Sequence, residues 1–394
     1  MANLPRYGRP DGDADMRAYA QLVAATFAGD PELMQGWVRD MGAPAVRVLR
    51  DGNQLAAGMT VFAMGQYFGG RAVPCWGLAG VVIPAHSRAR GLGRELLTTN
   101  LREQAQSGPP IASLYPASVA LYRKFGYGHG GLRAAASFRA LDVPAGKAVL
   151  QARPLQAADW PTVRALYAAA HGHENGPLER NSELWERQRR VSQGVLLQGM
   201  LLENAGKPEG YLVYTLARAP GVMRLQMHVR DWACTTPAAL QTLLALLHTQ
   251  RSVVDDIHLQ VSVSDPLVAA LLHDQTLRLG PQQMWMLRIV RVKDALEARG
   301  WPALGASADF QVIDEQLKVN AATWRLAVKD GVARLGKGGK AAPQLHIRGL
   351  AQLYSGLSTP AQLRVAGLLQ GSSKHDAALA ALFAGPAPWM PDYF

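Results

Sequence analysis

A basic loop that contains two glycines is the feature of the sequence with the clearest chemical potential. It reads Arg88-Ala-Arg-Gly-Leu-Gly-Arg94 and lies between the apolar run 78–83 and a stretch whose leucines recur at helical spacing. Glycines let backbone N–H groups turn toward a ligand, and the N-terminus of a helix adds partial positive charge. The loop alone would indicate a basic, solvated turn. Its position between a strand and a helix favours a site for phosphate oxygens.

Two common nucleotide-binding motifs are excluded by the residues around this loop. A dinucleotide fingerprint would have a third glycine where Leu96 stands. A triphosphate-binding loop would have lysine followed by serine or threonine where Arg94 and Glu95 stand. A phosphate-bearing cofactor of another kind stays compatible with the sequence.

The elements that must position the loop form an alternating α/β pattern through about residue 145. A hairpin is predicted at 46–62, around the Asp51-Gly52 turn, and the unbroken apolar run 78–83 predicts a buried strand. Leucines at helical spacing predict a helix over 92–101. A short strand at 111–114 and a short helix around 119–122 complete the pattern.

The chain is long enough for three domains, which we expect at 1–147, 148–302 and 303–394. The second segment repeats the order of strand, loop and helix, but its expected loop, 230–236, has no glycine. This pattern predicts a duplicated fold whose second copy has lost its ligand loop. In the third segment a hairpin at 324–335 is followed by helices at about 349–356, 360–368 and 376–384, which indicates an α+β domain.

Composition excludes several classes of protein. With 48% hydrophobic and 18% charged residues the chain should fold, and its net charge of +11 favours an anionic partner. The basic residues are scattered without runs or interleaved aromatics, so we expect no nucleic-acid partner. No apolar segment reaches the ~18 residues of a membrane span, and residues 1–10 contain no apolar signal region. We expect a cytoplasmic protein that does not associate with membranes.

Three further groups of residues are given structural roles. Cys75 and Cys234, the two cysteines, support neither a disulfide framework nor a metal cluster, and Cys75 is expected to be a small core residue. The segment 171–174, His-Gly-His-Glu, lacks a second ligand cluster and is interpreted as a solvated loop, so no metal is expected. The arginines at 187, 189 and 190 are interpreted as a solvated helix face.

The segment from Val81 to Gly93, followed by Leu121-Tyr-Arg-Lys-Phe-Gly-Tyr-Gly128, resembles the acetyl-CoA-binding core of GNAT-type N-acetyltransferases. Within that superfamily the chain resembles the Eis (enhanced intracellular survival) family over its whole length. The stretches 208–214, 288–300 and 387–394 are similar to signatures of the later domains. The resemblance implies an α/β and α+β fold: two tandem GNAT-like domains, the second degenerate, followed by a sterol-carrier-protein-like domain.

The resemblance also implies acetyl-CoA as cofactor and names its site. Backbone groups of Val81, Val82 and Ile83 would meet the pantetheine arm. The pyrophosphate would lie on the loop, whose residues are Arg88, Ala89, Arg90, Gly91, Leu92, Gly93 and Arg94. Ala117 and Ser118 stand where the family continues the cofactor site, although a Ser-Glu pair is common there.

Two residues match catalytic positions of the family. Tyr122 corresponds to the general acid, and a phenol of pKa ~10 can protonate a thiolate whose conjugate acid has a pKa of ~8.5. Its spacing alone would equally suit a core tyrosine. The general base of the family is a C-terminal carboxylate carried by a terminal aromatic residue, which is Phe394 in this sequence. The alternative for Phe394 is a frayed tail, against which Pro388, Trp389 and Pro391 argue.

The resemblance implies a primary amine on a bulky cationic acceptor, such as an aminoglycoside or a lysine-bearing molecule, as substrate. Phe27, Asp30 and Trp37 fall in the region that lines the acceptor pocket, and Glu32 and Asp392 are further acidic candidates. A hexamer is also implied, and a chain with few charges has apolar surface to cover in a homo-oligomer. The open alternative is a lipid or sterol carrier that uses the third domain and transfers no acetyl group.

Overall fold

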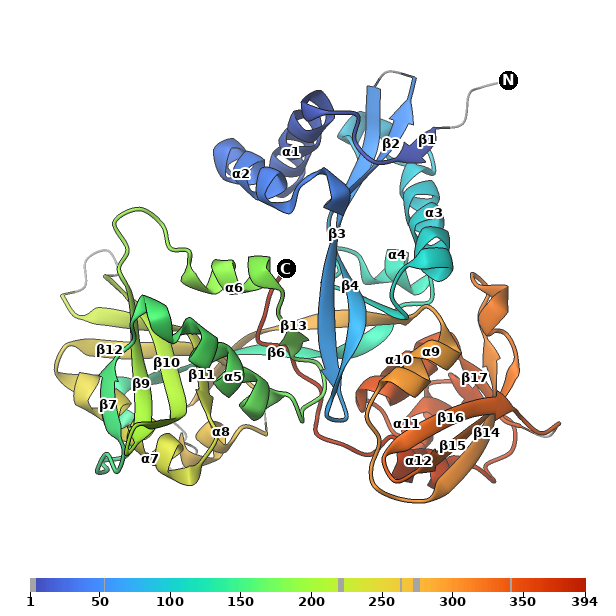
Figure 1. Ribbon diagram of the computed structural model, residues 1–394. Helices are drawn as coiled ribbons and strands as arrows, with labels where there is room; N and C mark the ends of the chain where they lie inside the picture. The colour runs from blue at the N-terminus through green and yellow to red at the C-terminus, as the bar shows by residue number, and fades with distance from the viewer. Residues whose placement is uncertain (1–4, 53, 219–222, 263, 272–276, 341) are drawn as a thin grey trace.

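The computed structural model describes residues 5–52, 54–218, 223–262, 264–271, 277–340 and 342–394. Residues 1–4 of the expected N-terminal segment lie outside the described part. The chain forms three lobes, with the first above the other two in Figure 1, and its C-terminus lies in the middle, between the first and second lobes.

The first lobe is a mixed sheet with helices on both faces. Its elements are β1 (Arg6–Gly8), α1 (Asp13–Phe27), α2 (Pro31–Met41), β2 (Val46–Asp51), β3 (Gln54–Phe68), β4 (Arg71–Val82), α3 (Leu92–Ser107), β5 (Ile111–Leu114), α4 (Val119–Arg123) and β6 (Gly128–Arg139). Helix α1 packs Tyr19 and Val23 on one face, and α3 packs Leu96 and Leu97 on the other. The helix that the leucine spacing predicted is therefore confirmed.

The second lobe repeats this layering. It contains β7 (Gln151–Pro154), α5 (Trp160–His171), β8 (Leu178–Glu179), α6 (Ser182–Arg189), β9 (Leu197–Asn204), β10 (Lys207–Arg218), β11 (Leu225–Cys234), α7 (Pro237–Thr249), β12 (Val254–Val261), α8 (Pro266–Leu271) and β13 (Arg278–Ile289). The prediction of a loop over 230–236 is wrong. Strand β11 continues to Cys234, because Asp231 and Trp232 are buried and Arg230 forms a bulge opposite β10.

The third lobe joins a smaller sheet to short helices. Its elements are α9 (Val292–Ala298), β14 (Ala306–Ile313), β15 (Thr323–Lys329), β16 (Val332–Lys337), β17 (Gln344–His346), α10 (Ile347–Ser355), α11 (Pro360–Val365), β18 (Leu369–Gln370) and α12 (Asp376–Leu382). The sheet runs in the order β16-β15-β14-β17-β18. The expected hairpin and three helices are present.

One continuous sheet crosses the first two lobes. The strand order is β1-β2-β3-β4-β5-β13-β6-β12-β11-β10-β9-β7, with β8 added to β3. Strand β13 of the second segment is inserted between β5 and β6 of the first, antiparallel to both. The two lobes therefore share their strands, and the domain limits expected at 147 and 302 stay predictions.

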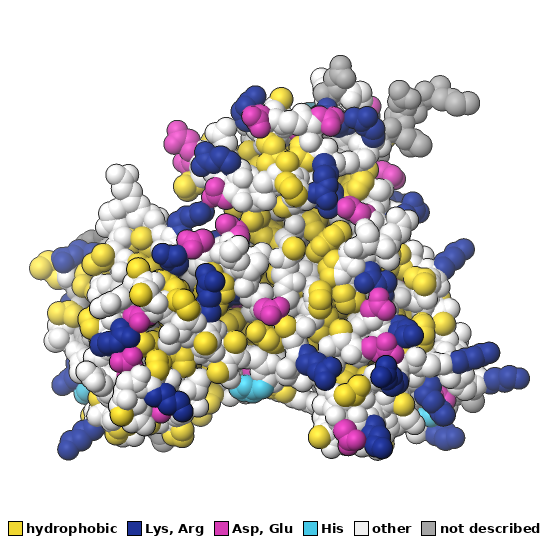
Figure 2. Space-filling view, viewed as in Figure 1, with side chains coloured by type: hydrophobic (Ala, Val, Ile, Leu, Met, Phe, Trp, Pro, Cys, Tyr) yellow, Lys and Arg dark blue, Asp and Glu magenta, His cyan; other side chains and the backbone are white. Residues whose placement is uncertain are grey.

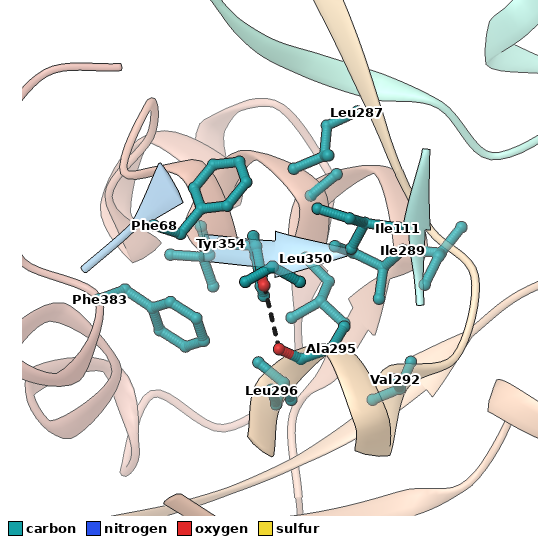
Figure 3. Close-up of a cluster of buried hydrophobic side chains, with 14 of the residues drawn as sticks. Phe68, Ile111, Leu287, Ile289, Val292, Ala295, Leu296, Leu350, Tyr354 and Phe383 are labelled. Atoms are coloured by element: carbon teal, nitrogen blue, oxygen red, sulfur yellow. Dashed lines mark hydrogen bonds between the residues drawn. The ribbon is translucent and has the colours of Figure 1, made fainter. Parts of the chain in front are cut away.

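The third lobe is packed against the first by large apolar side chains. Phe68, at the tip of the long β3–β4 hairpin, stacks edge-on against Tyr354 of α10, with ring centres 4.9 Å apart. The Tyr354 hydroxyl donates to the Ala295 carbonyl of α9 (3.0 Å), as Figure 3 shows. Phe310, Leu326, Leu345 and Leu350 fill the interior of the lobe and are fully buried.

Candidate active site

The site begins where β4 and β5 separate. These parallel strands pair from Cys75 with Ile111 to Leu78 with Leu114, and β5 ends there while β4 continues to Val82. Beyond this point the backbone of β4 has lost its neighbour on that side. The separation opens the sheet at the residues that follow Leu78, where this edge of β4 has no strand beside it in the described part of the chain.

A β-bulge turns the exposed end of β4 out of the ladder. Gly58 pairs with Val82 and Thr60 with Ala79, so Gly80 and Val81 form the extra backbone. Gly80 has φ +55, and a Cβ there would lie 2.4 Å from the Tyr19 hydroxyl. That hydroxyl donates to the Gly80 carbonyl (2.9 Å) and lies 2.8 Å from Thr60 Oγ1. Tyr19 on α1 therefore fixes the shape of the bulge.

The basic loop leads from the bulge into α3. Gly91 caps the helix with φ +83, and a Cβ placed on it would meet no atom within 4 Å. The first bond of the helix is donated by Glu95 to Gly91, so the N–H groups of residues 92–94 have no backbone acceptor in the described part of the chain. Arg88, Arg90 and Arg94 are exposed. Arg90 Nη2 lies 3.4 Å from Asp51. Free N–H groups and exposed guanidinium groups at a helix N-terminus suit phosphate oxygens.

A cavity of about 510 Å³ lies at the open end of the two strands. Its walls are Phe27, residues 78–81, residues 115–117, Val119, Tyr122, residues 282–284, Tyr393 and Phe394. Both predicted catalytic residues therefore face one cavity, together with Val81, Ala117 and Phe27. Figure 2 shows apolar side chains gathered in the hollow between the upper lobe and the lobes below it.

Tyr122 is held on the short helix α4 inside an apolar cluster. Its side chain is 5% exposed, and its ring lies edge-on to Tyr127 at 5.7 Å. Burial raises the pKa of Tyr122 to about 12. The hydroxyl is therefore protonated across the neutral range. The two interpretations of this residue are compatible, because it belongs to the core and also lines the cavity.

The last residues of the chain are docked at the site. Phe394 is 7% exposed, and its ring lies edge-on to Phe62 (6.0 Å) and Tyr115 (5.7 Å). Gly77 provides the space for this ring, since a Cβ there would come within 2.7 Å of it. A frayed tail is therefore wrong for Phe394.

The other acceptor candidates are placed differently. Asp30 is the N-cap of α2 and accepts a hydrogen bond from the Leu33 N–H (2.9 Å), and it does not line the cavity. The Trp37 ring packs on Phe62 at 6.2 Å and is not among the residues that line the cavity. Asp392 is 3% exposed and forms a salt bridge with Arg180, so its assignment as a free acidic group for the acceptor is wrong.

Two structural assignments also need correction. His171 is buried rather than solvated, and its Nδ1 lies 2.9 Å from Glu174. Burial alone would lower the pKa of His171, but the hydrogen bond to Glu174 and its charge outweigh this effect and raise it. Arg187 lies over the Phe62 ring at 4.8 Å, and burial lowers its pKa, whereas Arg189 and Arg190 are exposed as expected. Cys75 is confirmed as a core residue, and burial raises the pKa of its thiol to about 12.

Several functional residues were not found from the sequence. Gly80 could have been, because a lone glycine inside an apolar strand is a signal for a bulge. Tyr19 reads as one more apolar position of an amphipathic helix, and Tyr115 as the residue after a strand. Arg180 has no signal in its neighbourhood that points to the C-terminus.

Three regions of the chain match protein-family models. Residues 9–130 and 176–292 each match an acetyltransferase (GNAT) domain, and residues 292–391 match a sterol carrier protein domain. The fold class expected from the resemblance is therefore confirmed. Among the described residues no helix is long and apolar enough to cross a membrane.

Individual relatives agree with these matches. A GCN5-related N-acetyltransferase from Anabaena variabilis is 32% identical, with a TM-score of 0.92 over 99% of this chain and all of its own. The N-acetyltransferase Eis of Mycobacterium tuberculosis is 28% identical over 71% of this chain and 73% of its own length. The Eis1 structure from Mycobacterium abscessus shares the fold, at 22% identity, with a TM-score of 0.81 over 99% of this chain and all of its own.

Proposed function

Because the chain belongs to the Eis type of GCN5-related N-acetyltransferases, we propose that it transfers the acetyl group of acetyl-CoA to a primary amine. One observation carries this proposal. Tyr122, Phe394 and the bulged backbone at Gly80 and Val81 face a single cavity at the open end of β4 and β5. A thioester held by that backbone would lie between a proton donor and a carboxylate.

The residues present fit acetyl-CoA. The loop 88–94 would hold the pyrophosphate, and the backbone of Gly80 to Ile83 would hold the pantetheine arm. Ala117 lines the cavity, while Ser118 is the exposed N-cap of α4 and makes no side-chain capping bond. When bound, the cofactor supplies an acetyl thioester that an amine can attack.

Two groups of this chain handle protons. We assign the carboxylate of Phe394 as the group that accepts the proton of the substrate ammonium, directly or through a water. The Tyr122 hydroxyl holds the proton that the departing sulfur requires, since its raised pKa keeps it protonated. Both groups line the same partly apolar cavity, where electrostatic interactions are stronger than in bulk water.

The cavity wall favours a particular kind of acceptor. Phe27, Tyr393 and Met284 supply aromatic and apolar contacts, and Gln282 and Gln283 supply amides, with no acidic side chain among the lining residues described. A primary amine at the end of an aliphatic arm, as in lysine, suits these walls. A polycationic aminoglycoside would bring charges that the inner cavity does not balance, so any further positive charge would stay outside.

A direct assay tests the proposal. We expect release of CoA thiol from acetyl-CoA in the presence of a lysine-bearing peptide, with one acetyl group added per amine by mass spectrometry. Tyr122→Phe should lower kcat by about 10²-fold, since general acid catalysis contributes on that order. Tyr127→Phe is the matched control, because its ring packs on Tyr122 but does not line the cavity. Equal losses in the two variants would remove Tyr122 from the chemistry.

The lipid-carrier alternative receives no support from the third lobe. Its interior is occupied by its own side chains, among them Phe310, Leu345 and Leu350, all fully buried. A bound lipid would have to displace this packing. Native mass spectrometry that found a sterol or acyl ligand on the purified protein, without CoA turnover, would restore the alternative.

A further inference from the structure

Residues 386–394 form a strap that leaves the third lobe, runs up the middle of the molecule beside the second lobe, and ends between the first and second lobes (Figure 1). The loop after α5 holds its beginning: Asn175 Nδ2 donates to the Pro386 carbonyl (3.1 Å), and the Trp389 N–H donates to the Asn175 carbonyl (3.0 Å). Trp389 Nε1 donates to Glu174 (2.9 Å). The strap then pairs with Leu132 of β6, which bonds to Pro388 and Met390. Two lobes therefore hold the strap before it reaches the site.

Asp392 is the point at which the strap passes from one lobe to the other. Its carboxylate accepts two hydrogen bonds from Arg180 Nε (2.9 and 3.1 Å) and one from Gln188 Nε2 (3.1 Å), both in the second lobe. Its backbone carbonyl accepts from the Tyr115 hydroxyl (2.7 Å), which lines the catalytic cavity. Phe394 is two residues further along. The contacts of Asp392 therefore fix where the strap ends.

Arg180 is itself locked in place. It is 7% exposed, and its Nη1 and Nη2 donate to the two oxygens of Asp231 on β11 (2.6 and 3.0 Å). The Tyr167 ring lies 3.9 Å from the centre of the guanidinium group, and the Trp185 ring lies 4.7 Å from it. Asp231 also accepts from the Tyr211 hydroxyl (2.8 Å). A planar guanidinium that is bonded on both edges has no alternative position.

We propose that Arg180 is a positioning residue of the acetyl transfer: it links Asp231 of the second lobe to Asp392 of the strap and so sets the place of the Phe394 carboxylate in the first lobe. This inference rests on the proposed role of Phe394 as the base. Arg180 and Asp231 do not line the cavity. The second lobe would nevertheless contribute to catalysis through them, by holding the strap. A misplacement of about 1 Å at a reacting group can cost about 10²-fold in rate.

The test uses the full-length protein, three single variants and the double variant that combines Asp392→Asn with Arg180→Lys. Asp392→Asn and Arg180→Lys each weaken the link while keeping side-chain size close to the original. Asp309→Asn is the matched control, since Asp309 is also buried and bonded to an arginine (Arg325, 2.7 Å) but lies in the third lobe, away from the strap. Steady-state kinetics gives kcat and the acetyl-CoA KM, and carboxypeptidase digestion reports how firmly Phe394 is held.

We expect both link variants to lower kcat by about tenfold or more, with the acetyl-CoA KM changed by less than about twofold, and to release Phe394 faster. The double variant should lose less than the product of the two single losses, because both break one link. Asp309→Asn should leave kcat and digestion unchanged even where its melting temperature falls.

Unchanged kcat and digestion in Asp392→Asn and Arg180→Lys would overturn the inference. So would a proportionate fall in kcat in Asp309→Asn, because the losses would then reflect stability alone. Failure of the base assignment looks different. In that case removal of Phe394 itself leaves kcat intact, whatever the link variants do.

Discussion

Each of the two GNAT-like lobes contains an opening between two parallel strands, and the two openings differ in what surrounds them. In the first, β4 and β5 stop pairing at Leu78 and Leu114, and in the second, β11 and β12 stop pairing at His228 and His258. Each first strand carries a bulge against its antiparallel neighbour, at Gly80–Val81 in β4 and at Arg230 in β11. Each opening contains a cavity, of about 510 Å³ and about 370 Å³ respectively.

The difference lies in what precedes the next helix. Segment 83–91 brings exposed arginines and a glycine with positive φ to the start of α3, whereas two threonines join β11 to α7. At the start of α7, Thr236 Oγ1 donates to the Glu209 carboxylate (2.7 Å). A carboxylate in that place repels phosphate. The sheet opening is therefore common to both copies of the fold, whereas the basic, glycine-containing loop proposed to hold phosphate precedes α3 and has no counterpart before α7.

The loop beside the second opening contacts the C-terminal strap. His171, Glu174, Cys234 and Asp265 line the cavity of that opening, and Glu174 also binds Trp389 of the strap. The degenerate lobe thus holds the segment that carries Phe394 to the first lobe. Under the proposed function the two copies have different tasks: the first would bind the cofactor, and the second holds the tail.

The largest effect should follow from changing the end of the strap. Removing Phe394 withdraws the carboxylate by ~3.5 Å, and extending the chain replaces it with an amide that cannot accept a proton. We expect kcat to fall by about 10² to 10⁴-fold in both variants, the range that a general base contributes. Calorimetry with CoA should show unchanged affinity. Full activity in a C-terminally extended protein would move the base to another group.

Because only the first lobe has the basic loop, we expect each chain to bind one molecule of CoA. A substitution in that loop tests this expectation. Gly91→Val places a β-branched residue at φ +83 and blocks the approach of the pyrophosphate. CoA affinity should fall by about tenfold or more. Gly206→Val is the matched control, since Gly206 has φ +82 and equally open surroundings in the β9–β10 turn of the second lobe. If the Gly91→Val variant still bound CoA at the second opening, the proposed difference between the two lobes would be wrong.

The sequence predicted the local parts of this comparison and missed the distant ones. Helix α3 follows from the spacing of its leucines, strand β5 from its place in the alternating α/β pattern, and the loop from its glycines and arginines, because these signals lie within a few residues. The insertion of β13 between β5 and β6 joins segments far apart in the chain. Asp392 was misassigned for the same reason: its partner Arg180 stands in another lobe. The loop predicted over 230–236 from the repeated order of strand, loop and helix is wrong because Asp231 is buried against Arg180, a residue about fifty positions earlier in the chain.

The buried carboxylate of Asp265 should make the second opening a pH-dependent weak point. Burial raises its pKa from 3.8 to about 6, so folding favours the protonated form. That contribution is complete below about pH 4 and is lost as the pH rises through 6, where the buried charge costs up to about 3 kcal/mol. Asp265→Asn should therefore raise the free energy of unfolding above pH 6 and have little effect near pH 4, as measured by urea denaturation.

Asp309 provides the opposite case. Burial would raise the pKa of this carboxyl, but its hydrogen bonds from Arg325 and the Gly339 N–H outweigh burial and lower it. Asp309→Asn should thus lose stability at neutral pH and less of it in acid. If Asp265→Asn and Asp309→Asn both raised the free energy of unfolding at neutral pH, burial of a carboxylate alone, rather than the particular surroundings of Asp265, would explain the stabilisation.

The smallest effect on kinetics and stability should come from the Gly80–Val81 bulge of the first opening, whose shape Tyr19 supports. Tyr19→Phe removes the hydroxyl that bonds the Gly80 carbonyl and Thr60, which should cost about 1 kcal/mol of stability. Since the bulged peptides are the proposed contacts of the pantetheine arm, the acetyl-CoA KM should rise several-fold while kcat changes less. Tyr354→Phe removes an equally buried hydroxyl, bonded to Ala295 in the third lobe. It should cost similar stability without changing KM. If both variants left KM unchanged, the bulge would owe its shape to Gly80 alone, and Tyr19 would be a packing residue.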